Sequence, residues 1–201
     1  MNENLKQTFF IFIGKSGSGK GTQAELLIKR LKEKNPGKEV VTFGAGRYFR
    51  EFAAGDGYSR DLIRKYLEKG ALVPDFLTVY FWSKFFIEEL KGGEDVVMDG
   101  SPRKLMEAQI LDGVFEFYGG HAYIFNVYVS DDWARARLLG RGREDDKEEE
   151  IRNRLSWFET EVSPTIEFYK NHPKHTFFDI NGEQTIEEVA REIQTKLNGN
   201  F

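Results

Sequence analysis

The sequence contains no cysteine and no long apolar run. The first absence excludes disulfide bonds and a cysteine-ligated zinc site, and it fits a reducing compartment. The apolar runs are too short to span a bilayer, and the start of the chain has no signal-peptide character. A net charge of -4 argues against a general nucleic-acid or membrane-surface binder. We therefore expect a soluble, cytoplasmic protein that binds neither nucleic acid nor membranes.

What the chain does contain is enough apolar material for one sizeable core. With 201 residues, 40% of them hydrophobic, there is no reason to expect two independent domains. Strand-like and helix-like stretches alternate. The expected strands are 9–13, 39–43, 95–98, 122–129 and 176–180. The expected helices are 23–32, 48–54, 59–68, 76–90, 104–117, 133–139, 147–170 and 185–197.

The order of these elements predicts an α/β fold. Strands that alternate with helices favour a mainly parallel sheet with right-handed crossovers. Three successive helices between the second and third strands predict an all-helical insertion on the sheet. The stretch 147–170 is expected to be one long helix, broken or bent near Pro164.

A glycine-rich segment follows the first expected strand. Residues 14–22 read GKSGSGKGT and lead directly into a helix-like stretch. Glycines at this position let backbone N–H groups turn inward around an anion, which is the context of a phosphate loop. Lys20 can follow the β and γ phosphates of a nucleotide, and Thr22 offers a hydroxyl to magnesium. Lys15, the second cation of this loop, is expected to point to solvent.

A polar turn ends the third expected strand, at the same sheet edge as the phosphate loop. Asp99 there is placed to organise magnesium and its waters. Arg103 is placed for a two-pronged contact with a phosphate. The alternative is a plain polar turn with a surface ion pair.

Arginines recur beside glycines between residues 137 and 154. Arg137 and Arg141 are four residues apart and can share a helix face, while Gly140 and Gly142 give the connecting backbone freedom. The pattern predicts a mobile, arginine-rich flap over a site with concentrated negative charge. A solvated charged face is the alternative, and for residues 148–150 it is the interpretation we adopt.

Taken in order, these segments resemble the adenylate kinases and related nucleoside monophosphate kinases. The matching positions are 14–23, Gly46 with Arg50, Gly70 with 72–75, 99–100 with 102–103, Arg137 with 140–141, Arg143 with 145–146, and 154–155. The resemblance covers nearly the whole chain. It implies a single domain with the three-layer P-loop NTPase fold, in which helices flank a five-stranded, mainly parallel sheet. The implied parts are a core at about 1–43, 91–139 and 147–201, a helical monophosphate-binding insertion at about 44–90, and a short lid at about 140–146.

The resemblance also implies a reaction and its residues. The γ-phosphoryl group of Mg-ATP would move reversibly to a nucleoside monophosphate, with AMP as the leading acceptor, in a monomeric enzyme. The implied catalytic residues are Lys20, Arg103, Arg141, Arg143 and Arg154. The implied ATP-binding residues are Gly14, Ser16, Gly17, Ser18, Gly19, Lys20, Gly21, Thr22, Arg137, Arg141 and Gly182. The implied monophosphate-binding residues are Ala45, Gly46, Arg50, Ala71, Val73, Gly100, Arg103, Glu107, Arg143 and Arg154. Thr22 and Asp99 would hold Mg²⁺ directly or through water, and Asp145 and Asp146 would position the lid arginines.

Two departures from the family pattern leave the acceptor base open. Ala45 stands where adenylate kinases usually have a hydroxyl, and it resembles the uridylate and cytidylate kinases more. Glu107 stands where adenylate kinases use a glutamine, and a carboxylate cannot donate as an amide does. A UMP/CMP kinase therefore remains an alternative. So does a nucleotide-binding protein without turnover, which Arg47 beside the site would favour.

Other conspicuous side chains have a simpler interpretation. His121, His172 and His175 are expected to be loop residues without a ligand partner. Trp157 is expected to pack its helix on the sheet. Gly182 resembles a family loop near the donor adenine, although a plain turn fits it nearly as well.

Overall fold

The computed structural model describes residues 7–143 and 146–198. Its centre is one sheet of five parallel strands in the order β2-β3-β1-β4-β5. The strands are β1 Thr8–Ile13, β2 Val40–Gly44, β3 Asp95–Asp99, β4 His121–Tyr128 and β5 Thr176–Asn181. The helices are α1 Lys20–Lys34, α2 Ala45–Ala53, α3 Tyr58–Glu68, α4 Asp75–Glu89, α5 Leu105–Phe117, α6 Asp131–Arg141, α7 Glu148–Trp157, α8 Ser163–Lys170 and α9 Ile186–Asn198, with a π-helix, η1, at Phe158–Val162. The predicted α/β class, a five-stranded parallel sheet flanked by helices, is confirmed.

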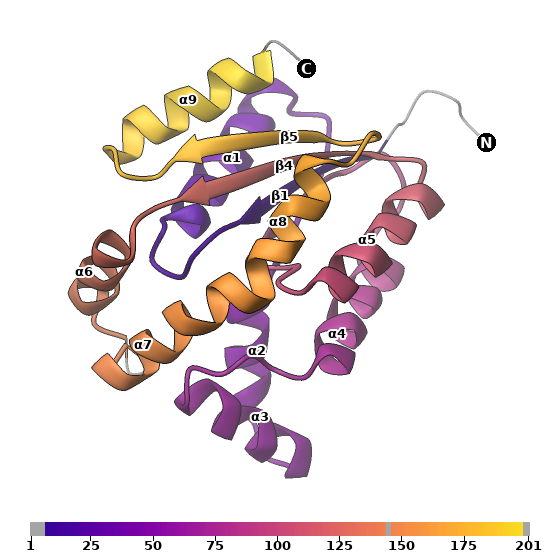
Figure 1. Cartoon of the computed structure of the whole chain (residues 1–201). Coiled ribbons are helices and arrows are strands. Elements are labelled where there is room, and N and C mark those ends of the chain that lie inside the picture. The colour runs from indigo at the N-terminus through magenta and orange to yellow at the C-terminus, as the bar shows by residue number, and fades with distance from the viewer. Residues whose placement is uncertain (1–6, 144–145, 199–201) are drawn as a thin grey trace.

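Strand β1 is in the middle of the sheet and is covered on both faces. Phe9 and Ile11 belong to one hydrophobic cluster, which includes side chains of α4, α5 and α8. Phe10 and Phe12 belong to the other cluster, with side chains of α1 and α9. Because strand side chains alternate between faces, a strand buried on both sides must be apolar throughout. Figure 1 shows the resulting three layers, with α1 and α9 on one side of the sheet and α5 and α8 on the other.

The helices α2, α3 and α4 follow one another between β2 and β3, as predicted. In Figure 1, α2 and α3 lie beyond the edge of the sheet. Helix α4 returns to the core, where Trp82 and Phe86 are fully buried in the cluster that contains Phe9. The aromatic side chains of α4 therefore tie this helical segment to the sheet.

The predicted helix 147–170 is three elements in succession. Helix α7 ends at Trp157, the π-helix η1 occupies the next turn, and α8 begins at Ser163 with Pro164 in its first turn. Proline lacks the N–H that an uninterrupted helix would need, so the preceding turn takes another hydrogen-bond pattern. The expectation that the helix is broken or bent near Pro164 is confirmed as a break, since a π-helical turn separates α7 from α8.

Helix α6 is longer than predicted, running from Asp131 to Arg141. Ser130 caps it by accepting a hydrogen bond from the Trp133 N–H at 3.3 Å, and it ends at Gly142, whose φ of 65° is left-handed. Gly140 and Arg141, expected in the lid, are therefore helical. No helix within residues 7–143 and 146–198 is long and apolar enough to cross a membrane.

Candidate active site

A cavity of about 930 Å³ opens at the carboxyl edge of the sheet. Such an edge is where open α/β sheets bind ligands, because the loops after the strands meet there. The sequence-predicted residues that line the cavity are Ser16, Gly17, Gly19, Lys20, Gly21, Thr22, Gly46, Arg50, Ala71, Val73, Asp99, Gly100, Arg103, Arg137, Arg141, Arg143 and Arg154. The fold thus brings together residues that are up to 138 positions apart in the chain.

The glycine loop has the tight form that was expected of it. Gly17 and Gly19 have φ values of 85° and 87°, in the left-handed region that favours glycine. A Cβ atom on Gly17 would lie 2.6 Å from the Ala134 carbonyl oxygen, so this glycine also allows close contact with α6. Lys20 begins α1 and donates to the Lys15 carbonyl oxygen at 2.9 Å, which holds its ammonium group across the loop.

The ammonium group of Lys20 is buried among other charges. Burial lowers its pKa to about 8; the carboxylate of Asp99 opposes this shift, and Arg103, Arg141 and Arg143 add to it. Because a further positive charge is unfavourable in this cavity, a bound anion would be stabilised there. The electrostatics therefore point to a ligand with several negative charges.

Asp99, the last residue of β3, packs against the glycine loop. Its Oδ2 atom would lie 3.1 Å from a Cβ atom on Gly21. Its Oδ1 atom is buried and makes no hydrogen bond with any residue that the structure describes. A carboxylate oxygen left in this state beside an anion-binding loop is suited to a cation or its waters.

Arg103 lines the cavity and contacts both Gly100 and Trp157 of α7. Its Nε donates to the Gly100 carbonyl oxygen at 2.8 Å, and its guanidinium lies 5.6 Å from the centre of the Trp157 ring. Burial lowers the pKa of Arg103. Its backbone N–H donates to Glu107 Oε2 at 2.7 Å. The guanidinium is thus fixed at Nε in a residue that lines the cavity.

Asp146 organises the arginines that were assigned to the flap. Arg141 donates to both of its carboxylate oxygens at 2.7 Å, and Arg154 donates to Oδ1 at 2.9 Å. The Arg143 N–H donates to Oδ2 at 3.3 Å. Burial alone would raise the pKa of Asp146, but the bonds from Arg141 and Arg154 lower it overall. One carboxylate thereby holds guanidinium groups from α6 and α7. Asp145, its expected companion, falls outside the described residues.

Two tryptophans of the cavity wall were not predicted as site residues. Trp157 donates from Nε1 to the Gly70 carbonyl oxygen at 3.0 Å, so it links α7 to the segment before α4. Trp133 lies under Arg137, with the guanidinium 5.3 Å from its ring centre. The spacing of Trp133 and Arg137, four residues apart on one helix, is the sequence signal that could have revealed that pair.

Lys15 does not point to solvent, and that expectation was wrong. Its ammonium group lies 2.6 Å from Asp131 Oδ1 and 5.1 Å from the centre of the Phe158 ring. Asp131 is in the first turn of α6, 116 positions further along the chain. The second cation of the loop therefore ties the loop to α6 and η1.

Five predicted residues lie outside the main cavity lining. Ala45 and Glu107 line a small neighbouring pocket with Val73, Gly100 and Arg103. Gly14 and Ser18 of the loop, and Gly182, lie where segments pack closely: a Cβ atom on Gly14 would be 2.3 Å from the Val127 carbonyl oxygen, and one on Gly182 would be 3.1 Å from the Ser18 carbonyl oxygen. The two glycines thus allow close packing of the loop against β4 and the segment after β5.

The parallel sheet, the glycine loop at its carboxyl edge and the buried lysine and arginines define a P-loop protein that binds polyphosphate ligands. The family model described as adenylate kinase matches residues 12–174. Since this match spans most of the chain, the protein belongs to the adenylate kinase family.

Individual relatives agree with the family match. Adenylate kinase 1 of Nostoc sp. is 34% identical over 191 residues, which cover 94% of this chain and 98% of that protein. The adenylate kinase of Trichodesmium erythraeum is 33% identical over 194 residues, with 94% and 96% covered. That of Helicobacter pylori strain Shi470 is 34% identical over 195 residues, with the same coverage. The similarity thus extends over nearly the full length of these proteins.

Proposed function

We propose that this protein transfers the γ-phosphoryl group of ATP reversibly to AMP, so that ATP and AMP give two ADP. The observation that carries the proposal is the set of cationic side chains around one cavity, Lys20, Arg50, Arg103, Arg141, Arg143 and Arg154. Two nucleotides that meet for phosphoryl transfer concentrate negative charge, and such a ring matches it. The relatives named as adenylate kinases support the same activity.

In this proposal the glycine loop holds the donor phosphates. Its backbone N–H groups and Lys20 face the β and γ phosphates, and Arg137 lies beside the donor over Trp133. Arg50 and Arg103 hold the acceptor phosphate at the other end of the cavity. Arg141, Arg143 and Arg154 surround the transferred group, held by Asp146. The acceptor is already an anion, so alignment and charge stabilisation suffice and no general base is needed.

Magnesium fits the residues beside the loop. Asp99 offers a buried carboxylate oxygen without a hydrogen-bond partner among the described residues, and Thr22 lines the same cavity. Oxygen donors of this kind, directly or through water, suit Mg²⁺. When bound with ATP, the ion would neutralise phosphate charge.

The neighbouring pocket of Ala45 and Glu107 is our candidate for the acceptor base. Glu107 is buried, with 3% of its surface exposed, and burial raises the pKa of its carboxyl group, an effect that the Arg103 N–H opposes. An oxygen of its carboxyl group would accept a hydrogen bond from the N6 amine of adenine. UMP has no exocyclic amine to donate there, which favours AMP over UMP despite the missing glutamine.

The segments of the chain, its oligomeric state and its location belong to the same proposal. We propose that residues 44–90 form the acceptor-binding segment and that residues 140–146 act as a short lid. The protein would work as a cytoplasmic monomer on free nucleotides, without nucleic acid or membrane partners. The net charge of -4 supports the absence of nucleic-acid and membrane partners, and the lack of cysteine fits the reducing cytoplasm.

A coupled assay tests the function and separates it from the alternatives. The purified chain is given ATP, magnesium and one monophosphate at a time, namely AMP, CMP, UMP or GMP. We expect turnover with AMP and a kcat/KM at least tenfold lower with UMP, which lacks an exocyclic amine. Turnover with UMP or CMP but not AMP would replace the proposal with a UMP/CMP kinase. Nucleotide binding without turnover on every acceptor would leave a non-catalytic protein.

A further inference from the structure

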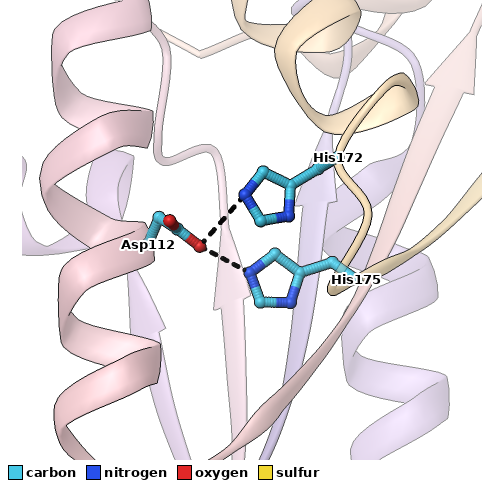
Figure 2. Close-up of side chains that lie close together, drawn as sticks. All are labelled: Asp112, His172 and His175. Carbon is cyan, nitrogen blue, oxygen red and sulfur yellow. Dashed lines mark hydrogen bonds and ion pairs between the residues drawn. The ribbon is translucent and has the colours of Figure 1, made fainter.

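Three side chains with metal-binding chemistry gather at the opposite edge of the sheet from the cavity. Asp112 is on α5, while His172 and His175 are in the turn between α8 and β5 (Figure 2). The turn precedes β5, so the cluster is at the amino end of the strands and the glycine loop is at their carboxyl end. The expectation that these histidines have no ligand partner was therefore wrong. The sequence could not reveal it, because Asp112 is 63 positions from His175.

The geometry of the three side chains is that of a partly formed coordination sphere. His175 Nε2 lies 2.8 Å and His172 Nε2 lies 3.4 Å from the same Asp112 oxygen, Oδ1. One ligand atom from each residue lies within 4.8 Å of the other two. Tetrahedral zinc with bonds of about 2.0–2.1 Å separates its ligands by about 3.3–3.4 Å. Small movements of the side chains would therefore place all three around one ion.

Packing holds the two imidazoles in register. Their rings are stacked at 4.5 Å with an interplanar angle of 12°. Phe115 meets the His175 ring edge-on at 5.3 Å, and Phe168 lies 5.2 Å from the His172 ring. Rings confined in this way lose little further freedom when they coordinate an ion.

The cluster is partly open to solvent, and both imidazoles can present an unprotonated Nε2 to an ion. The Asp112 side chain is 27% exposed and those of His172 and His175 are 12% and 4% exposed, so the carboxylate forms the open side. Coordination through Nε2 moves the imidazole hydrogen to Nδ1. For His172 this gives up a contact with the Lys174 N–H that is already 3.4 Å long. For His175 the Nδ1 atom is buried without a partner among the described residues, so no bond at Nδ1 is lost, and the Nε2 contact with Asp112 is replaced by coordination to the ion.

We propose that Asp112, His172 and His175 bind one divalent ion of the zinc class, with water as the fourth ligand. Two imidazoles and one carboxylate are nitrogen and oxygen ligands that zinc accepts in a tetrahedral site. The ion joins α5 to the turn before β5, and thereby stabilises the fold at the edge remote from the nucleotides. The inference does not rest on the proposed phosphotransfer.

Zinc titration of the full chain tests the site. The protein is stripped with a chelator, kept free of nucleotides, and titrated against a chromogenic zinc indicator. We expect about one equivalent to bind with a dissociation constant in the micromolar range or tighter. Asp112→Asn, His172→Gln and His175→Gln should each weaken binding by roughly tenfold or more. His121→Gln is the matched control, because this histidine lies near His175, with ring centres 6.1 Å apart, but outside the set of three.

Two further measurements make the outcome decisive. Cobalt(II) in place of zinc should give the visible spectrum of a tetrahedral site in the wild type and not in Asp112→Asn. Zinc should raise the thermal midpoint of the wild type and of His121→Gln, but not that of His172→Gln. If His175→Gln fails to fold, the variants of the two more exposed residues, Asp112 and His172, still test the metal site. No binding in the micromolar range, or equal binding by the wild type and the ligand variants, would overturn the site.

Discussion

The carboxylate of Asp146 receives two hydrogen bonds from the guanidinium of Arg141, each 2.7 Å long. The Asp146 side chain is fully buried, and Arg154 donates to it as well. A single acid thus holds two of the arginines assigned to the transferred phosphoryl group, so its removal should disturb position and charge together.

We expect Asp146→Asn to lower kcat roughly tenfold or more, because the arginines lose their common alignment. The loss of charged hydrogen bonds should also destabilise the protein by about 1–3 kcal/mol. Steady-state kinetics and urea unfolding measure the two effects. Glu148→Gln is the control, since it breaks the exposed Arg135 pair at 2.6 Å and should change neither. An Asp146→Asn enzyme with normal kcat would refute the alignment role.

The pKa of Lys20, about 8, predicts proton uptake on nucleotide binding. The lysine is charged below this pH and loses its charge above it in the free protein. Bound phosphates favour the charged form and raise the pKa, so about one pH unit above this value ATP binding should take up part of a proton. Calorimetry in buffers of different ionisation enthalpy measures the uptake. Lys20→Arg, which stays charged, should show none of this contribution; equal uptake in both would contradict the assignment.

Glu107 is predicted to select the acceptor base. Glu107→Gln keeps an oxygen that can accept from the exocyclic amine, so kcat/KM for AMP should stay within a few-fold of the wild type or rise. Glu107→Leu removes this acceptor and should lower kcat/KM for AMP by at least about tenfold, with little change for UMP. Circular dichroism verifies that the variants are folded. If Glu107→Leu kept the preference for AMP, the base would bind elsewhere.

Trp157 is predicted to support the acceptor side through its hydrogen bond to the Gly70 carbonyl oxygen. Trp157→Phe retains an aromatic ring against Arg103 but loses the bond, which we expect to raise KM for AMP about 3–10-fold. KM for ATP should change little. The control is Trp133→Phe, beside Arg137, which should leave KM for AMP unaltered. Equal changes in both KM values for Trp157→Phe would argue against a role on one side.

The fold and the loop were predictable because their signals are local. Residues 9–13 are apolar throughout because β1 is buried on both faces, and this pattern is visible in the sequence. The glycine pattern of 14–22 is also visible in the sequence, and Gly14, Gly17 and Gly19 have the positive φ angles that favour glycine. Both features follow from neighbouring residues alone.

The less predictable features depend on contacts between distant segments. Lys15 pairs with Asp131, and Asp112 with His175, only because the folded sheet brings α6, α5 and the β5 turn into place. The Trp157 side chain reads as core packing until its Nε1 partner on Gly70 is known. Periodicity reports which face of a helix is apolar, but it does not report which polar groups meet across the fold.

Transfer of a labelled phosphoryl group from ATP to AMP is the defining step of the proposed reaction. The purified chain is incubated with magnesium, AMP and ATP labelled at the γ position, beside a Lys20→Ala variant that is verified as folded. We predict that the label appears at the β position of ADP with the wild type, and at a rate lower by orders of magnitude with the variant. Label that stays on ATP, or appears only as inorganic phosphate, would refute phosphoryl transfer to AMP, and a variant with a normal rate would refute the role of Lys20.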